Sequence, residues 1–541
     1  METSHTDRTR PAQEYARHRT RHGTRHLRAT LLALTAAGGL LLTGCGAGEG
    51  SHSNTSDASN RTGFPAPAPA TTSGGDNSSQ QDGEQTSTPA DRIAPSPDYL
   101  STFALDVDTA SYGYARRVLA DGQLPDPSTI RPEEFVNSFR QDYDRPDGNG
   151  FTVTVDGART DSANWSLVRV GLATRPQSRL RSTGETPIAD DSAERPPAAL
   201  TFVIDVSGSM AETGRLDLAK KSLDEMTDRL RDDDSVALVT FSDEAETVLP
   251  MTRLDGHRGK VHHAIDELET QSSTNLGAGV ETGYATATEG LREGATNRVV
   301  LISDGLANTG DTNADSILER ITNERRDHGI TLFGVGVGSD YGDALMEKLA
   351  DKGDGHTAYV SDDADARKVF VDQLPQNIDL TARDAKAQVA FDPETVAQFN
   401  LIGYEDRKVA DDDFRNDNVD GGEVGPGHTV TALYAVRTRP GADGHLATAS
   451  VRWLDPNTRA PHEESGQLET DALHDSLSSA SPRFQVTAVA AYFADSLRSG
   501  DLPGDPGLDE LADRAHALAK ETEDKDVQQL AEAIDEASRM N

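Results

Sequence analysis

Hydrophobic and polar residues follow two different patterns along the chain. Between about residues 198 and 377, short apolar runs are separated by stretches in which apolar residues recur every three or four positions. The runs are typical of buried parallel strands, and the stretches are typical of helices that cover them. We therefore predict a doubly wound α/β domain, with helices on both faces of a mostly parallel sheet. Its predicted strands are 200–206, 236–241, 298–302, 330–337 and 357–360, and its predicted helices are 213–231, 257–270, 276–291, 314–328, 343–351 and 363–374.

The segments on either side of this region alternate apolar and polar residues with a period of two. Such alternation is typical of antiparallel strands that are buried on one face only. Because strand-rich segments lie on both sides, we predict that they pair into one β-sandwich into which the α/β domain is inserted. The predicted sandwich strands are 151–155 and 165–172 before the α/β domain, and 387–391, 429–436 and 447–453 after it.

Helical patterns are predicted near both ends of the folded region. A stretch running to Leu119 and residues 132–139, which begin with a proline, predict two helices before the sandwich strands. Charged helical stretches at 484–498, 508–520 and 524–539 predict a C-terminal helical segment. The predicted domains are a signal peptide at 1–44, a tether at 45–96, an N-terminal α+β segment at 97–196, the α/β domain at 197–377, and a β-rich then helical domain at 378–541.

The first residues of the chain have the pattern of an export signal. Seven arginines in residues 8–28 precede an apolar stretch at 31–42, which is shorter than the ~20 residues that a membrane span needs. The only cysteine, Cys45, follows Leu42-Thr43-Gly44, and this sequence resembles the lipobox of bacterial lipoproteins. The resemblance implies lipidation of Cys45 and anchoring at the extracytoplasmic face of the cell membrane. An ordinary signal peptide with an incidental cysteine is the alternative.

Composition narrows the classes of partner. Residues 46–95 are mostly Ser, Thr, Gly, Asn, Gln and Pro, so we predict a flexible tether with an end-to-end distance of ~40 Å. The formal net charge of −39 repels nucleic acid, and we expect no nucleic-acid partner. Residues 334–338 are rich in glycine but lack the spacing of a dinucleotide fingerprint, and no Gly-Lys-Ser/Thr sequence occurs. We therefore expect no nucleotide partner.

Three segments at the ends of predicted elements carry hydroxyl and carboxyl groups. Asp205, Ser207 and Ser209 follow the first buried strand, with a spacing of two that directs their side chains to one side of an extended turn. Thr274 lies at a loop-to-helix junction, and Asp304 ends another buried strand. These loops emerge at one edge of a parallel sheet, so their oxygens can converge. Two carboxylates and three hydroxyls suit a hard divalent cation, with Mg²⁺ favoured over Mn²⁺ and Ca²⁺. Turns and helix caps without a metal are the alternative.

The three elements together resemble the metal-ion-dependent adhesion site of von Willebrand factor type A domains. The resemblance implies that the hydroxyls of Ser207, Ser209 and Thr274 contact the metal directly. It also implies that Asp205 and Asp304 do so directly or through water. The flanks resemble bacterial YfbK-like lipoproteins at residues 103–112, 121–125, 401–407, 419–423 and 427–434, and this similarity extends over roughly 97–540. That family is defined by its architecture more than by an activity.

Two other acidic segments have simpler interpretations than a cation site. Residues 416–421 match the start of a calcium loop except at the first position, but Gly427 stands where a bidentate Glu is needed, so an acidic turn is favoured. Asp106 and Asp108 precede the first helix and are interpreted as turn or cap residues.

The residues favour binding over catalysis. No recognisable pattern of nucleophile and base occurs, and we predict that the chain is not an enzyme. With only two anionic ligands, a bound cation still attracts a carboxylate from outside, so we predict a membrane-anchored, extracytoplasmic module that binds an acidic residue of a protein partner. A structural or assembly role in a cell-envelope complex is the alternative, and metal-dependent hydrolysis is less favoured.

Overall fold

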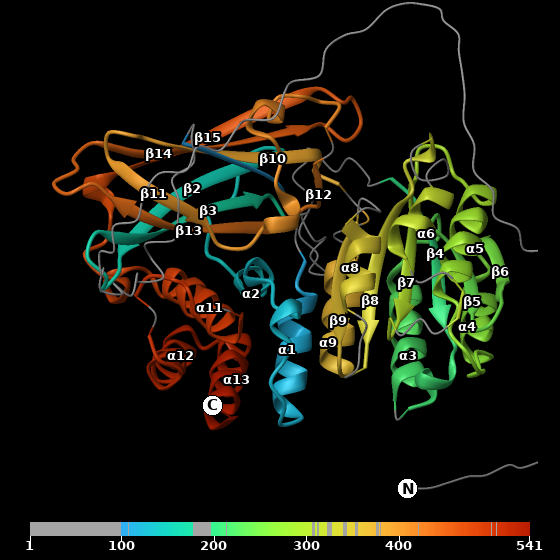
Figure 1. The fold of residues 1–541 in the computed structure, drawn as a ribbon. Helices are drawn as coiled ribbons and strands as arrows, with labels where there is room; N and C mark the ends of the chain where they lie inside the picture. The colour runs from blue at the N-terminus through green and yellow to red at the C-terminus, as the bar shows by residue number, and fades with distance from the viewer. Residues whose placement is uncertain are drawn as a thin grey trace, which may run out of the picture. The chain divides into compact units, whose positions relative to one another are not determined.

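A computed structural model describes residues 99–540, apart from residues 106–107, 177–195, 213, 306–308, 311–312, 322–326, 339–342, 352–354, 375–377, 379, 420, 499 and 505 (Figure 1). The predicted signal peptide, the tether with Cys45, and Asp106 lie outside the described residues. None of the helices in the described part of the chain combines the length and the apolar character that crossing a membrane requires.

A six-stranded sheet forms the centre of the α/β domain. Its strands are β4 (Ala198–Asp205), β5 (Ser235–Phe241), β6 (Ala245–Arg253), β7 (Thr296–Ser303), β8 (Thr331–Val337) and β9 (His356–Val360). They lie in the order β6-β5-β4-β7-β8-β9, and only β6 runs antiparallel to its neighbour. Every residue of β4, β5 and β8 is buried, because their apolar runs are covered on both faces.

Helices cover both faces of this sheet, as the sequence predicts (Figure 1). One face packs against α3 (Arg215–Arg229), α4 (Arg258–Asp266), α9 (Asp363–Arg367) and the π-helix at Lys368–Gln373. The other packs against α5 (Leu276–Glu289), α6 (Ala314–Arg320) and α8 (Asp343–Asp351). Helix α5 lies close to the sheet because Gly283 has no side chain, and a Cβ atom there would be 2.3 Å from Val203.

Two antiparallel sheets form the β-sandwich, with strands from both flanks. One sheet contains β1 (Leu100–Ala104), β10 (Ala382–Phe391), β12 (Gly422–Val424), β14 (His445–Leu454) and β15 (Pro461–Glu469). The other has the order β11-β13-β3-β2, with β2 (Phe151–Arg159), β3 (Trp165–Thr174), β11 (Val396–Leu401) and β13 (Thr429–Thr438). Apolar residues of both sheets share one core, which confirms the predicted sandwich around an inserted α/β domain.

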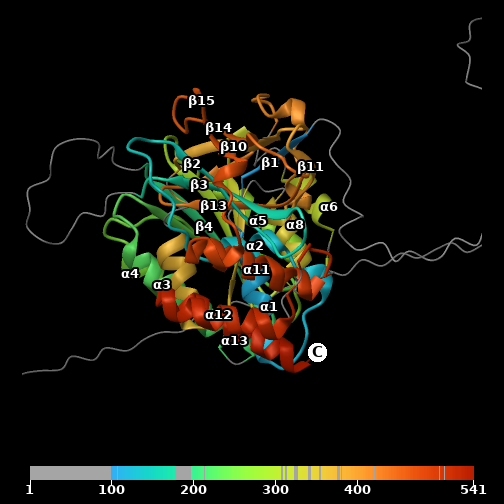
Figure 2. The same cartoon turned by 90° about the vertical axis from the view of Figure 1, so that its left-hand side faces the viewer.

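A helical layer covers the outer face of the β2-β3 sheet (Figures 1 and 2). It contains α1 (Ala110–Ala120), α2 (Pro132–Asn137), α11 (Pro482–Arg498), α12 (Leu508–Thr522) and α13 (Lys525–Met540). The shared core joins Trp165 of β3 to Phe135 of α2 and Phe484 of α11. Short 3₁₀ helices lie at Pro127–Thr129, Gly208–Ala211, Glu405–Arg407, Asp411–Asp413, Thr470–Ala472 and Leu477–Ser479.

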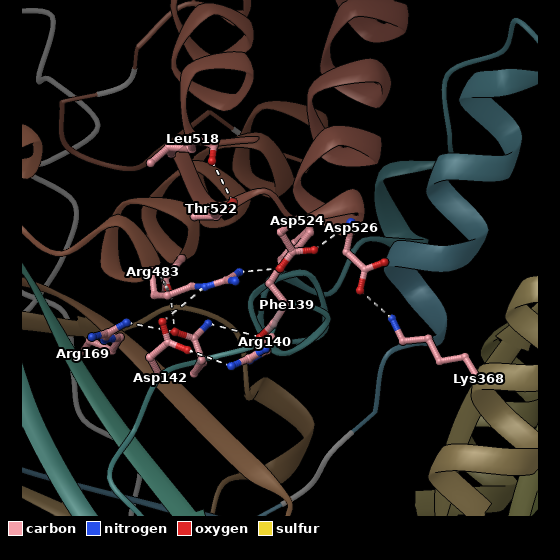
Figure 3. Close-up of polar contacts among 12 residues, drawn as sticks. Phe139, Arg140, Asp142, Arg169, Lys368, Arg483, Leu518, Thr522, Asp524 and Asp526 are labelled. Atoms are coloured by element: carbon pink, nitrogen blue, oxygen red, sulfur yellow. Dashed lines mark hydrogen bonds and ion pairs between the residues drawn. The ribbon is translucent and has the colours of Figure 1, made fainter. Parts of the chain in front are cut away.

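Ion pairs join the α/β domain to the flanking parts. Lys368 Nζ lies 3.1 Å from Asp526 at the start of α13, close to the pair between Arg483 and Asp524 (Figure 3). The buried Arg298 NH2 of β7 lies 2.9 Å from Glu423 of β12. The α/β domain is therefore fastened by side chains from both the helical layer and the sandwich.

Candidate metal centre

Asp205 and Asp304 lie side by side at the carboxyl edge of the central sheet. Asp205 is the last residue of β4, and Asp304 directly follows β7, the parallel neighbour of β4. Both side chains are 0% exposed. The sequence pattern placed both residues at strand ends, and the strand order makes those two ends adjacent.

The Asp205 carboxylate accepts hydrogen bonds from neutral donors. The Ser207 backbone N–H donates to Oδ1 at 2.8 Å, and the Ser303 hydroxyl donates to Oδ2 at 2.6 Å. Burial raises the pKa of Asp205 to about 6, against the lowering effect of the Ser303 and Ser207 hydrogen bonds, and repulsion from Asp304 adds to the rise. The edge therefore holds two buried carboxylates that are close enough to repel each other.

Ser207 and Ser209 place two hydroxyl groups beside these carboxylates. They lie on the turn that leaves β4 and enters the 3₁₀ helix at Gly208–Ala211. Their Oγ atoms are 3.0 Å apart, so the two hydroxyls face the same small region. Ser207 is buried and Ser209 is half-buried.

Thr274 precedes α5 on a loop that is tied to both carboxylate-bearing segments. The Gln271 N–H donates to the Val206 carbonyl, and the Thr309 N–H donates to the Thr274 carbonyl at 3.1 Å. Ser273 has a φ of 72°, a left-handed conformation that is uncommon for serine and turns the chain into the helix. Thr274 itself is 1% exposed. All five predicted residues thus belong to connected segments at one edge of the sheet.

Arg215 is a member of this cluster that the sequence analysis did not identify. It is the first residue of α3, and its side chain is only 8% exposed. Its NH1 lies 3.2 Å from Asp304 Oδ2 and donates to the Ser209 carbonyl at 3.3 Å, while NH2 lies 2.9 Å from Glu212. An arginine among polar residues at a helix start has no sequence signal that separates it from a solvated one.

The donor set fits a hard divalent cation. Every side chain named in the predicted site offers oxygen, and the two carboxylates are buried where a positive charge would offset their repulsion. Among the described residues, no group of three or more His, Cys, Asp and Glu side chains could hold a metal ion. The edge differs from such a group because hydroxyls make up part of its oxygen donors.

The weaker sequence candidates have structural roles where the chain is described. The Lys386 ammonium donates to the carbonyls of Asn416 at 2.7 Å and Val419 at 2.6 Å, inside the segment that resembled a calcium loop. Asp108 accepts a hydrogen bond from the Thr357 N–H and pairs with Arg407 at 2.7 Å. The glycine-rich residues 334–337 lie within the buried strand β8.

Family models match most of the described chain. Residues 199–373 match the von Willebrand factor type A domain, and residues 377–540 match the C-terminal part of "Uncharacterized protein YfbK". Residues 82–169 match a further model described as von Willebrand factor. The matched regions correspond to the α/β domain, to the following strands and helices, and to part of the N-terminal flank.

Similar proteins include bacterial and animal ones. The chain is 34% identical over 431 residues to "Uncharacterized protein YfbK" of Escherichia coli strain K12, which covers 76% of this chain and 73% of that protein. A shorter region is 26% identical to mouse inter-alpha-trypsin inhibitor heavy chain H3, covering 31% of this chain and 20% of that one. A solved structure of von Willebrand factor type A from Catenulispora acidiphila covers 72% of this chain and 91% of that chain, at 17% identity and a TM-score of 0.43.

Proposed function

Because the chain belongs to the YfbK family and contains a von Willebrand factor type A domain, we propose that it binds a protein partner through a divalent cation. The cation is Mg²⁺ in this proposal, with Mn²⁺ and Ca²⁺ as alternatives. Asp205, Ser207, Ser209, Thr274 and Asp304 hold it, and a carboxylate of the partner completes its coordination. The bound cation supplies a positive charge that attracts this carboxylate.

The main support is the pair of buried carboxylates beside converging hydroxyls. Asp205 and Asp304 are fully buried, and the Ser207 and Ser209 hydroxyls are 3.0 Å apart. The two carboxylates carry two negative charges, equal to the charge of one divalent cation. However, Asp304 also pairs with the positively charged Arg215. A cation held there is thus incompletely neutralised by the protein, which favours an additional acidic ligand over a neutral one.

The proposed location is the extracytoplasmic face of the cell membrane, through a lipid on Cys45. The support is sequence alone: an arginine-rich start, an apolar stretch and a single cysteine at the position of a lipobox. Mass spectrometry of the mature N-terminus tests it. A lipidated Cys45 at the new N-terminus agrees with the proposal, and a free Cys45 inside an intact chain contradicts it.

Calorimetric titration of the full-length chain in detergent tests the metal site. We expect one Mg²⁺ or Mn²⁺ ion per chain, and no measurable binding by Asp205→Asn or Asp304→Asn. Asp217→Asn, at an exposed position of the same domain, is the matched control and should bind like the parent. Binding that is equal in all four proteins would contradict the site.

An assembly role is the second candidate, in which the metal only fixes the loops. It is favoured over hydrolysis because Ser303, whose hydroxyl donates to the Asp205 carboxylate, is 0% exposed and cannot reach a substrate. Partner binding that is lost in chelator and in Asp205→Asn agrees with the first proposal. Association with the envelope complex that survives both treatments agrees with the second.

A further inference from the structure

We propose that Arg215 is an internal competitor of the divalent cation, which lowers the affinity of the site by holding Asp304. This inference rests on the proposed metal site and adds its regulation. The guanidinium pairs with Asp304, and an ion that takes this carboxylate as a ligand must draw it away from Arg215. The affinity for the ion then depends on two free energies: the interaction of Asp304 with the ion, and the interaction of Asp304 with Arg215 that must be given up.

The position of Arg215 is unfavourable for a positive charge on its own. It is the first residue of the 15-residue helix α3, and the amino end of a helix favours anions through its macrodipole. Burial also removes the guanidinium from water, which raises the free-energy cost of a positive charge at this position. The contacts with Asp304, Glu212 and the Ser209 carbonyl offset part of this cost and help to hold Arg215 in place.

The surrounding backbone is shaped around this guanidinium. A Cβ atom at Gly338, which follows β8 and has a φ of +94°, would be 2.5 Å from Arg215 Nε and 2.6 Å from Cζ. The side chain is thus held between the turn after β4, the end of β7 and the end of β8. Three segments of the sheet edge fix the group that neutralises Asp304.

Arg215 treats the two carboxylates of the site differently. It pairs with Asp304, whereas Asp205 accepts hydrogen bonds from the Ser207 N–H and the Ser303 hydroxyl, both neutral. The charge that the site offers to a metal is therefore closer to one unit than to two. A divalent cation that binds strongly enough to recruit Asp304 must overcome the charge-assisted bond to Arg215.

A cavity next to the cluster is open to solvent, and Arg215 lines it. This cavity of about 710 Å³ is lined by Arg215, Glu212 and Gly338, together with Lys221 and Arg117. Glu212 is exposed and stays bound to Arg215 NH2 at 2.9 Å, so it can retain the guanidinium after Asp304 turns to the metal. Asp304 can therefore change its partner from Arg215 to the metal ion while Arg215 stays in its position.

The test is the affinity of Arg215→Met for Mg²⁺ and Mn²⁺, measured by calorimetry on the full-length chain in detergent. We expect the variant to bind about tenfold more tightly than the parent, because a buried positive charge next to a ligand is removed. Arg229→Met removes the same charge at an exposed position at the other end of α3, ~20 Å away, and should bind like the parent.

A second readout is the melting temperature, measured in chelator and with added Mg²⁺. In chelator, Arg215→Met should melt at a lower temperature than the parent, because Asp304 loses its cation, and added Mg²⁺ should raise its melting temperature by more than it raises that of the parent. If Arg215→Met does not fold, Arg215→Gln, which keeps a donor for the Ser209 carbonyl, should give the same gain in affinity.

The possible outcomes separate this inference from the proposed function. A parent that binds the ion and an Arg215→Met variant with equal or weaker affinity overturns the competitor role and leaves the metal site standing. A parent and variants that all bind no ion overturn both.

Discussion

The sheet edge around Asp205 and the loop around Asn416 both contain several oxygen atoms close together, but different groups donate to these oxygens. In the loop, the Lys386 ammonium, 1% exposed, donates to two backbone carbonyls. At the sheet edge, no basic side chain among the described residues forms an ion pair with Asp205. In the loop the chain's own ammonium thus takes the oxygens that a metal ion would need, whereas at the sheet edge Arg215 pairs with Asp304 but not with Asp205.

A buried carboxylate elsewhere in the molecule shows a third solution. Glu133, in the first turn of α2, has a buried Oε2 atom with no hydrogen-bond partner, and a Cβ atom at Gly403 would be 2.0 Å from it. Burial raises the pKa of Glu133 to about 8, and repulsion from Glu134 adds to the rise. A pKa of about 8 favours the protonated carboxyl at neutral pH, so the oxygens of the three regions are offset by a lysine, a proton and, in our proposal, a metal ion.

The largest expected effect comes from removing the lysine. Lys386→Met takes the ammonium donor away from two carbonyls in a buried position and should lower the free energy of unfolding by about 3 kcal/mol. Both tryptophans, Trp165 and Trp453, lie in sandwich strands, so the urea midpoint of tryptophan fluorescence reports on this part of the molecule. Lys408→Met, at an exposed position nearby, is the control and should unfold like the parent. A variant at Lys386 as stable as the parent would show that the loop does not need its cation.

The second effect is stabilisation by the metal at the sheet edge. An ion present at a hundred times its dissociation constant stabilises the folded chain by about 2.7 kcal/mol. Thermal unfolding followed by circular dichroism should therefore shift upward with Mg²⁺ relative to chelator. Asp205→Asn should lose this shift, and Lys386→Met should keep it, since its loop does not depend on the metal. Loss of the shift in Lys386→Met would mean that the two regions are not independent.

The third effect is a pH dependence set by Glu133. Its pKa lies near 4.5 in the unfolded chain and is raised to about 8 in the folded one, so the folded state binds more protons between these values. Stability from this group is full below about pH 4.5 and falls as the pH rises toward 8. Glu133→Gln, which carries no charge, should be more stable than the parent at pH 6 by about 2 kcal/mol and equal to it near pH 4.

Urea midpoints at both pH values, read from tryptophan fluorescence, measure this difference. Glu510→Gln changes an exposed position of α12 and should show no dependence on pH relative to the parent. An equal gain from Glu133→Gln at both pH values would point to packing against Gly403 instead of a proton.

The sequence predicted the fold well where hydrophobic periodicity is strong. The buried runs of the α/β domain, the strands β3, β13 and β14 and the three C-terminal helices all have clear patterns. Strands such as β15 were not predicted, because Pro461–Glu469 is a polar edge strand that is almost wholly exposed and leaves no alternation to recognise. The strand β6 is likewise a half-exposed edge.

The sequence located the carboxyl and hydroxyl residues that meet at the sheet edge, but not the basic side chain beside them. The positions of Asp205 and Asp304 could be predicted because both residues end apolar runs, and such runs are local features of the sequence. Arg215 and Lys386 are buried by segments far away in the sequence: Gly338 and Asp304 cover the first, and residues 416–419 cover the second. The alternation in β10 puts Lys386 on the face opposite the core residues Ala387 and Val389, and nothing in that pattern shows that a later loop covers it.

The smallest expected effect lies on the rim of the loop that encloses Lys386. Arg415 forms two hydrogen bonds to Glu463, at 2.6 and 3.0 Å, but its side chain is 65% exposed. Exposed ion pairs contribute about 0.5 kcal/mol and are screened by salt, so Glu463→Gln should lower the free energy of unfolding by that amount at low salt and by almost nothing in concentrated salt. The deficit of Lys386→Met should persist in salt, because its ammonium and the carbonyls are shielded from water. Urea unfolding of both variants at two salt concentrations separates the cases: a salt-sensitive deficit in Lys386→Met would mean that water reaches the loop, and that the ammonium acts there as a surface charge and not as an enclosed cation.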